Sequence, residues 1–150
     1  MTPRRAIPAD LPFLLGLAKA AYDSEVDLKA VARWLEHSIF DPDIMMLRTE
    51  DAGGVATVLP LFHHPHRLHG HMLFLARNPN ACMASAMDAF RVLRALVEWA
   101  RSRGAIDFSG GSDTNVDLGP FFKRLGGVSD TPSYVISFEG ERWATRSAAS

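Results

Sequence analysis

The sequence predicts a single α/β domain. The chain has 150 residues, which is long enough for one substantial core, and its 47% hydrophobic and 22% charged residues are typical of a globular protein. The expected elements follow in the order strand, two helices, three strands, long helix, strand, short helix, strand. We find no internal repeat, low-complexity segment or linker. One domain is therefore expected over residues 1–139, followed by a polar tail over residues 140–150.

The first half of the domain begins with a short strand and two helices. The strand is predicted at Arg4 to Ile7, between Pro3 and Pro8. Asp10 is expected to cap the following helix, and a second helix extends from about Asp27 to Ile39. The first helix has its apolar residues at helical spacing: Leu11, Leu14, Leu15, Leu17, Ala18 and Ala21.

Three strands follow the second helix, which ends at Asp41-Pro42-Asp43. They are expected at Ile44–Thr49, Val55–Phe62 and His71–Ala76. Between the first two strands, the segment Glu50–Gly54 is rich in residues that accept unusual backbone angles, which predicts a turn.

The longest predicted helix runs from about Ala81 to Arg103 and is ended by Gly104. Its expected buried stripe consists of Met83, Met87, Phe90, Leu93, Val97 and Ala100. The remaining elements are a strand at Ile106–Gly110, a short helix near Leu118–Leu125 and a last strand at about Tyr134–Phe138.

The charge balance argues against partners that need a strong electrostatic field. Sixteen basic and seventeen acidic side chains give a formal net charge of -1, so neither nucleic acid nor an anionic membrane is an expected partner. No apolar run approaches the roughly 18 to 20 residues that span a bilayer. Cys82 is the single cysteine and cannot form an internal disulfide, which favours a reducing, cytoplasmic compartment.

The stretch from Gly104 to Gly127 reads GAIDFSGGSDTNVDLGPFFKRLGG: a short strand, an Asn-containing loop and a helix with Phe-Phe-Lys-Arg-Leu-Gly. This order resembles the C-terminal half of the GNAT superfamily of N-acetyltransferases, in which the helix ends in Phe-Tyr-x-Lys-x-Gly. The order of elements over nearly the whole chain and the opening Arg-Arg-Ala-Ile-Pro-Ala-Asp-Leu also resemble this family. The resemblance implies a mixed, mostly antiparallel sheet flanked by helices, with acetyl-CoA as the cofactor of an active member.

Members of this family bind the pyrophosphate of the cofactor in a loop between the fourth strand and the long helix, with the pattern Gln/Arg-x-x-Gly-x-Gly/Ala. By this resemblance, the candidate cofactor-binding residues are Arg77, Asn80, Ala81 and Cys82 in that loop and the later loop residue Asn115. Backbone N–H groups at the start of a helix suit an anion. The loop has no glycine, and Pro79 lacks an N–H, so Asn80 has a second interpretation as the cap of the long helix.

The sequence assigns no catalytic residue. Phe122 stands where the family often has a Tyr, and a phenyl ring cannot protonate a leaving thiolate. The strand His71–Ala76 offers no carboxylate as a general base. Asp107 and Ser109 alternate along the strand after the long helix, so they face either a cleft or solvent at an edge.

Five histidines fall within His63–His71, HHPHRLHGH, between two predicted strands. Imidazoles across a hairpin can bind a metal ion or form a pH-sensitive surface. The spacing matches no known ligand pattern and no Cys lies nearby. We therefore expect an exposed polar loop without a metal site.

Two functions remain open. One is a GNAT-fold component that acts through protein contacts, as a homo-oligomer or in an assembly such as a virion. The departures at the cofactor loop and at Phe122 favour this function, and compact chains of this kind are similar to some encoded by tailed bacteriophages. The other is an acetyl-CoA-dependent N-acetyltransferase of unknown acceptor. Trp143 in the tail bears on the first function, since it either enters an interface or folds back on its own domain.

Overall fold

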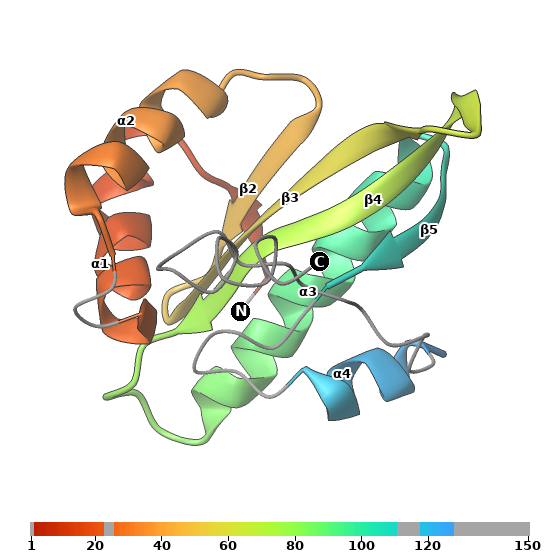
Figure 1. Cartoon of the computed structure of the whole chain (residues 1–150). Helices are drawn as coiled ribbons and strands as arrows, with labels where there is room; N and C mark the ends of the chain where they lie inside the picture. Colours follow the sequence, from red (N-terminus) through yellow and green to blue (C-terminus); the bar gives the residue numbers. More distant parts are fainter. Residues whose placement is uncertain (1, 23–25, 111–117, 128–150) are drawn as a thin grey trace, which may run out of the picture.

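The computed structural model describes residues 2–22, 26–110 and 118–127. Within them, five strands form one sheet in the order β1-β2-β3-β4-β5, antiparallel from β1 to β4 and parallel between β4 and β5 (Figure 1). The strands are β1 (Arg4–Arg5), β2 (Ile44–Arg48), β3 (Ala52–Leu61), β4 (His64–Arg77) and β5 (Ala105–Ser109). The predicted mixed, mostly antiparallel sheet is confirmed.

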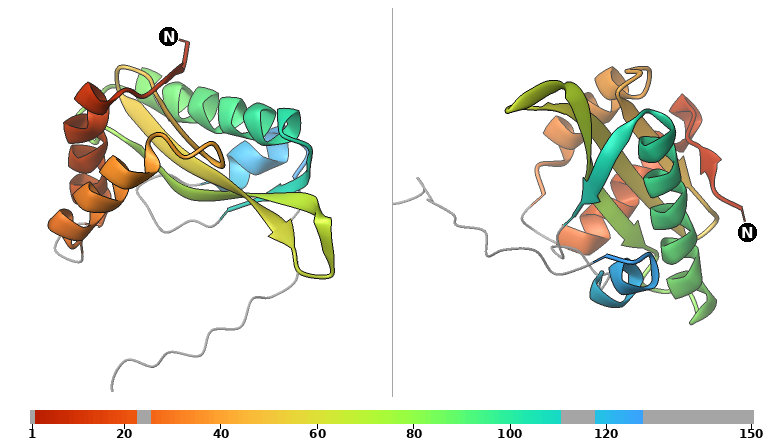
Figure 2. Two further views of the ribbon diagram at one scale, coloured as in Figure 1. Left: turned by 90° about the horizontal axis from the view of Figure 1, so that it is seen from above. Right: turned by 90° about the vertical axis from the view of Figure 1, so that its right-hand side faces the viewer.

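Helices cover both faces of this sheet (Figures 1 and 2). On one side lie the short 3-10 helix η1 (Pro8–Asp10), α1 (Leu11–Tyr22) and α2 (Leu28–Ser38), and on the other side lies α3 (Ala84–Ser102). We call these sides the α1 face and the α3 face. The last described helix, α4 (Gly119–Arg124), packs beside α3, where the rings of Phe121 and Phe90 lie 5.4 Å apart.

The sheet separates two clusters of buried apolar side chains. The cluster on the α3 face includes Leu75, Val92, Leu93 and Leu96. The cluster on the α1 face consists of Ala6, Leu14, Leu35, Ile39, Met46 and Val55. Each large aliphatic side chain that is buried contributes about 1.5–3 kcal/mol, so both layers of helices are held to the sheet mainly by these contacts.

The predicted turn at Glu50–Gly54 is wrong in its second half, because β3 already begins at Ala52. Gly53 and Gly54 lie in the strand, directly under the helices. A Cβ atom on Gly53 would come within 2.6 Å of Leu14 Cδ2, and one on Gly54 within 2.9 Å of Val92 Cγ1. These glycines therefore let α1 and α3 approach the strand closely, a use that a Gly-Gly pair does not reveal in the sequence.

The prediction of a histidine loop is also wrong for most of its length. β3 and β4 form a long hairpin, visible in Figure 1, whose turn is only Phe62 and His63, and β4 begins at His64. The histidine rings at the exposed tip contact one another edge-on. His69 and His71 lie further along β4, in the part of the strand that pairs with β5.

The long helix α3 begins at Ala84, with Met83 at its N-cap position, and not at Ala81. Asn80 therefore does not cap this helix. Met83 and Met87 are 90% and 39% exposed, so the first part of the predicted stripe is wrong. The helix packs on the sheet from Ala89 onward, through the buried residues Ala89, Phe90, Val92, Leu93, Leu96 and Ala100.

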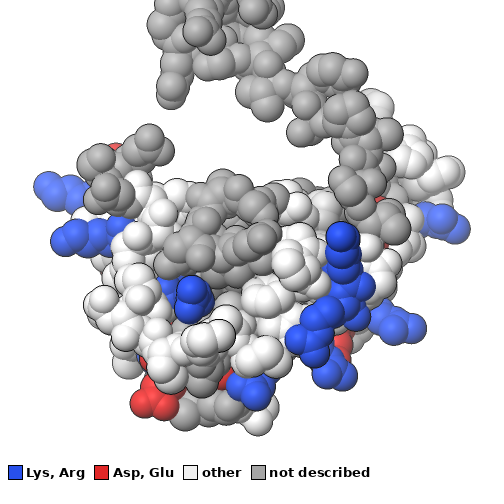
Figure 3. Space-filling view, turned by 90° about the horizontal axis from the view of Figure 1, so that it is seen from below, with Lys and Arg blue, Asp and Glu red and all other residues white. Residues whose placement is uncertain are grey.

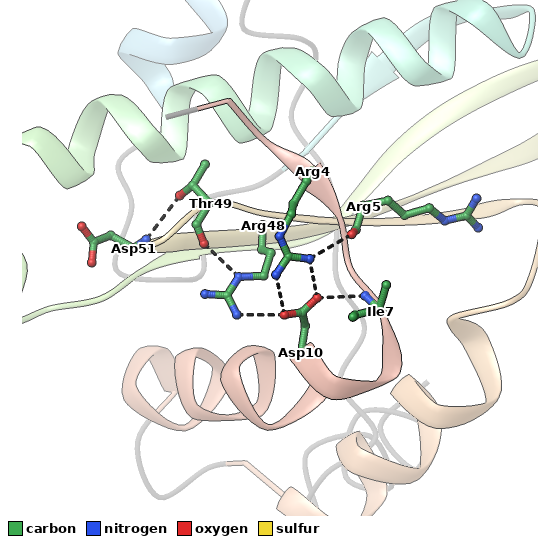
Figure 4. A network of polar contacts seen from close by, with 7 residues as sticks. All are labelled: Arg4, Arg5, Ile7, Asp10, Arg48, Thr49 and Asp51. Carbon is green, nitrogen blue, oxygen red and sulfur yellow. Dashed lines mark hydrogen bonds and ion pairs between the residues drawn. The ribbon is translucent and has the colours of Figure 1, made fainter.

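Asp10 was expected to cap the first helix, but its carboxylate instead joins the N-terminal segment to β2 (Figure 4). It accepts hydrogen bonds from Arg4 at 2.7 and 2.8 Å, from Arg48 at 3.1 Å and from the backbone N–H of Ile7 at 2.9 Å. The hydrogen bonds from Arg4, aided by those from Ile7 and Arg48, hold the pKa of Asp10 well below its ordinary value, although burial acts in the opposite direction.

Several predicted features lie outside the described residues. These are the last strand at Tyr134–Phe138, Asn115, Trp143 and the tail over residues 140–150. Among the helices that are described, none is long and apolar enough to cross a membrane.

Candidate active site

β4 and β5 pair over only part of their length. The pairing extends from Leu68 to His71 on β4, where His71 lies opposite Ser109. β5 ends at Ser109, whereas β4 runs on to Arg77. The second half of β4 therefore extends past the end of its parallel neighbour.

Four polar side chains at this junction point to the α1 face. Gly70 and Phe108 face α3, because a Cβ atom on Gly70 would lie 2.9 Å from Ala100 Cβ and 2.8 Å from Phe108 Cδ2. Side chains alternate along a strand, so the residues on either side of Gly70 and Phe108 face the other way. These residues are His69, His71, Asp107 and Ser109.

The four side chains form one chain of hydrogen bonds, which we call the β4–β5 relay. His69 Nδ1 contacts the carboxylate of Asp107. The hydroxyl Oγ of Ser109 lies 3.0 Å from His69 Nε2 and 2.9 Å from His71 Nδ1. The serine thus lies between the two imidazoles.

With neutral rings and an ionised carboxylate, one arrangement of protons satisfies all three contacts. A carboxylate only accepts, so His69 donates from Nδ1 to Asp107, which leaves His69 Nε2 as an acceptor. The hydroxyl of Ser109 donates to that nitrogen, and its oxygen accepts from His71 Nδ1. His71 Nε2 then carries a lone pair and can accept a proton.

The relay has the composition that general-base catalysis needs. When His71 accepts a proton, its imidazole becomes positively charged. The negative carboxylate of Asp107, at the other end of the hydrogen-bonded chain, compensates for this charge. The side chains of His69 and Asp107 are 26% and 57% exposed, so the relay is open to a substrate. An exposed ion pair of this kind adds little to the stability of the fold.

Sequence reasoning identified part of the relay. The sequence predicts that Asp107 and Ser109 alternate along a strand and face a cleft or an edge, but it places His69 in a loop and His71 at the boundary between that loop and the strand His71–Ala76. The sequence pattern that could have revealed the relay is two pairs of polar residues at i, i+2 spacing, His69 with His71 and Asp107 with Ser109, on separate strands. Only the pairing of β4 with β5, a contact between residues far apart in the sequence, brings the pairs together.

A pocket of about 330 Å³ lies between α1, α2 and the α1 face of the sheet. We call it the α1–α2 pocket. None of the described residues that line it is charged, and they include Leu14, Tyr22, Trp34, Val55, Leu73 and Phe74. Trp34 and Leu73 are 41% and 40% exposed, so the pocket opens to the surface.

A β-bulge brings Leu73 to this pocket. Phe74 lies opposite Val55 and Met72 opposite Ala56, which leaves Leu73 as the extra residue on β4. Leu73 and Phe74 both line the pocket as a result. His71 precedes Leu73 by two positions on the same strand, so the relay and the pocket are about 7 Å apart along β4.

A wider hollow of about 590 Å³ lies on the outer side of α3 and is lined by Thr2, Pro3, Arg91, Arg94, Ala95 and Glu98. The sheet and α3 separate it from the β4–β5 relay. This hollow is therefore not part of the candidate site.

The predicted cofactor loop joins the end of β4 to the start of α3. Arg77 is the last residue of β4, and Asn80, Ala81 and the exposed Cys82 follow in the loop. Asn78 organises the loop, since its Oδ1 accepts from the N–H of Asn80 at 3.1 Å and its carbonyl from the N–H of Ala81 at 3.2 Å. These two N–H groups are thus engaged within the loop, and an anion here would meet the first turn of α3 instead.

Basic side chains are prominent on the side of the molecule that is seen from below (Figure 3). Figure 3 shows the underside of the molecule, where α3 begins and α4 lies, with basic side chains more prominent than acidic ones. Lys123 and Arg124 lie in the last turn of α4. The role of the loop residues Arg77, Asn80, Ala81 and Cys82 in cofactor binding stays a prediction.

Phe122 is part of the packing around the α3-face cluster. Its ring stacks with that of Phe108 at 6.4 Å, and a Cβ atom on Gly110 would lie 3.3 Å from Phe122 Cζ. The ring of Phe122 therefore packs against the end of β5. Within the described residues, no three histidine, cysteine, aspartate or glutamate side chains form a group that could hold a metal ion.

No protein-family model matches the sequence, and no curated protein matches it at a significant level. Solved structures do match the fold. Glucosamine-6-phosphate N-acetyltransferase from Arabidopsis thaliana superposes with a TM-score of 0.71 at 14% identity, over 92% of this chain and 98% of that one. The aminoglycoside 6'-N-acetyltransferase of Acinetobacter haemolyticus gives 0.70 at 14% identity, over 93% and 99%.

A predicted acetyltransferase from Clostridium acetobutylicum, whose structure was determined with acetyl-CoA, gives a TM-score of 0.64 at 16% identity, over 91% of this chain and 94% of that chain. These identities establish a shared fold and no more. The order of the elements, the topology of the sheet and the superpositions, which cover nearly the full length of this chain and of each solved structure, all indicate the same fold. The chain has the fold of the GNAT acetyltransferases.

Proposed function

We propose that this chain is an acetyl-CoA-dependent N-acetyltransferase in which His71 is the general base. The observation that carries the proposal is the β4–β5 relay, which lies where β4 begins to extend past β5. The fold shared with acetyltransferases supports the reaction class. The protein-contact function favoured by the sequence was expected to use the histidine segment His63–His71, the tail over residues 140–150, or both, and it stays a prediction.

The relay addresses the main chemical requirement of acetyl transfer to an amine. An amine in water at neutral pH is largely protonated, and only the neutral form has a lone pair that can attack a carbonyl carbon. His71 accepts the proton of the acceptor at Nε2, and Ser109 and His69 connect His71 to Asp107. A positioned base of this kind contributes about 10²–10⁴-fold to the rate.

The residues present also fit a bound acetyl-CoA. Its phosphates would be held by the first turn of α3, where the helix dipole is positive. Arg124 of α4 lies against α3, with its guanidinium carbon 4.5 Å from the centre of the Phe90 ring. Its extended arm suits Met72–Phe74, the backbone just past the end of β5, because a strand can add hydrogen bonds to an extended ligand. When bound, acetyl-CoA supplies an acetyl group activated as a thioester.

The experiment compares His71→Ala with His66→Ala, a change at the exposed hairpin tip that leaves the relay intact. Release of CoA is followed with acetyl-CoA and a panel of primary amines. We expect His71→Ala to lower kcat by about 100-fold or more, and Ser109→Ala to lower it less, because Ser109 acts through the imidazoles. His66→Ala should retain the wild-type rate.

Binding of the cofactor is checked separately by thermal unfolding of the full chain. Acetyl-CoA that binds the native state increases the free energy of unfolding, by about 2.7 kcal/mol when its concentration is 100 times Kd. Tm rises as a result. An unchanged Tm at millimolar acetyl-CoA would contradict the proposal. So would a His71→Ala variant that keeps the wild-type kcat.

A further inference from the structure

We infer that the acceptor is a small primary amine with an apolar body, and that this body binds in the α1–α2 pocket while its nitrogen lies at His71. The inference rests on the proposed function and deepens it, because it names the class of acceptor. Three properties of the pocket support it: its place next to the relay, the chemistry of its lining and its size.

The place of the pocket links it to the base. Leu73 and Phe74 belong to both the pocket and β4, and His71 precedes them on the same face of the sheet. The bulge at Leu73 turns an additional side chain toward the pocket. An acceptor whose body fills the pocket can therefore place its amine at His71 through a short linker that spans at most about 7 Å.

The lining decides which amines gain affinity. Tyr22 and Trp34 provide the polar side-chain groups of the described lining, and the rest is aliphatic or aromatic carbon. Because none of the described lining residues is charged, this part of the lining has no ion pair to offer a second ammonium group or a phosphate. Desolvation of such a group would cost free energy that nothing in the pocket returns. A polyhydroxylated or multiply charged amine is therefore a poor acceptor.

The size limits the acceptor. A volume of about 330 Å³ is near the lower end of the range for ligand pockets, roughly 300–1,000 Å³. A phenylethyl group or an alkyl chain of a few carbons fits this space. The aromatic rings of Tyr22, Trp34 and Phe74 offer flat surfaces to either.

The experiment measures binding without acetyl-CoA, so that it does not depend on turnover. The n-alkylamines from ethylamine to hexylamine and 2-phenylethylamine are titrated into the full chain, and the change in tryptophan fluorescence is recorded. We expect Kd to fall about four-fold for each added methylene until the pocket is full. Trp34→Phe should abolish the fluorescence change, which locates the signal in the pocket.

Transfer kinetics give the second measurement. With acetyl-CoA present, kcat/KM should rise along the same series, and glucosamine and spermidine should be acetylated at least ten-fold less efficiently than hexylamine. Leu73→Ser should lower kcat/KM for hexylamine about ten-fold and change that for ethylamine by less than two-fold. Phe62→Ser, at a ring that is 98% exposed at the hairpin tip, should change neither.

The two proposals fail in different ways. If alkylamines bind with the expected increments but no acetyl group is transferred, the pocket assignment stands and the transferase proposal is overturned. If acetyl transfer occurs with kcat/KM independent of chain length, or faster to glucosamine or spermidine than to hexylamine, the pocket assignment is overturned. A lack of any fluorescence change with all amines also overturns it, because an amine bound in the pocket would lie next to the indole of Trp34.

Discussion

At the scale of single residues, the molecule contains two charged networks with opposite properties. The Asp10 network is buried at its carboxylate, accepts from two arginines and a backbone N–H, and fixes the N-terminal segment against β2 (Figure 4). The guanidinium of Arg48 also lies 3.5 Å above the centre of the Phe13 ring. The β4–β5 relay is partly exposed and contains two imidazoles. The first network therefore serves the fold, and the second is available for proton transfer.

The Asp10 network predicts a pH-dependent loss of stability in Asp10→Asn. The ordinary pKa of an aspartate is about 3.9, and that of folded Asp10 is lower. The ionised form therefore contributes its stability fully above pH 4 to 5, and this contribution declines as the pH falls toward the folded pKa. We expect Asp10→Asn to reduce the free energy of unfolding by about 1–3 kcal/mol at pH 7, and by less at pH 2.

Urea unfolding of both proteins between pH 7 and pH 2 measures this difference. Glu36→Gln, at an exposed position on α2, is the control and should differ from wild type by less than about 0.5 kcal/mol at every pH. A difference for Asp10→Asn that stays constant over this range would show that the carboxylate does not act through its charge.

At the scale of elements, β3 is the strand on which the packing depends. α1 covers one side of it and α3 the other, and its two adjacent glycines let both helices come close. Leu75, Val92 and Leu96 surround the position that a Cβ on Gly54 would take, at 2.9 to 3.1 Å. Gly16 in α1 is different, because a Cβ there would meet nothing within 4 Å.

This contrast predicts opposite signs for the same substitution. Gly54→Ala should destabilise the protein by about 1–3 kcal/mol, because three packed side chains must move. Gly16→Ala should stabilise it by about 0.5–1 kcal/mol, because alanine reduces the conformational entropy of the unfolded chain and is preferred in a helix. Chemical denaturation of the two variants beside wild type measures both effects. Equal signs would contradict the close approach of α3 to β3.

At the scale of the whole molecule, one sheet joins two apolar clusters, one on each face. Among the described residues, the last one that packs against either cluster is Leu125. Within the described residues, β4 extends past the end of β5, and the relay, the α1–α2 pocket and the cofactor loop lie along β4 in that region. One strand thus supplies residues to each part of the candidate site.

The composition of the tail predicts the effect of removing it, because residues 140–150 are mostly polar or small and show no helical or strand periodicity. A chain that ends at Gly140 should still unfold in one cooperative transition, with coincident curves from circular dichroism and fluorescence. If the tail and Trp143 also mediate protein contacts, sedimentation will show assembly in the full chain and its loss after truncation. Assembly that persists in the truncated chain would contradict that role of the tail.

The sequence alone determined the α/β class, the order of the described elements and the resemblance to a family, because these depend on local periodicity and composition. The second helix, for example, was expected from about Asp27 to Ile39, and the structure has it at Leu28–Ser38 with Asp27 as its N-cap. Local sequence patterns gave wrong predictions where the same residues occur both in turns or loops and in strands. The Gly53-Gly54 pair was interpreted as a turn, and the histidines as a loop.

Only the tertiary structure decided the site. His69 and His71 meet Asp107 and Ser109 through the parallel pairing of two strands that a long helix separates in the sequence. The α1–α2 pocket likewise combines residues from two helices and two strands. Contacts of this kind depend on how buried faces pack against one another, which no local pattern of residues encodes.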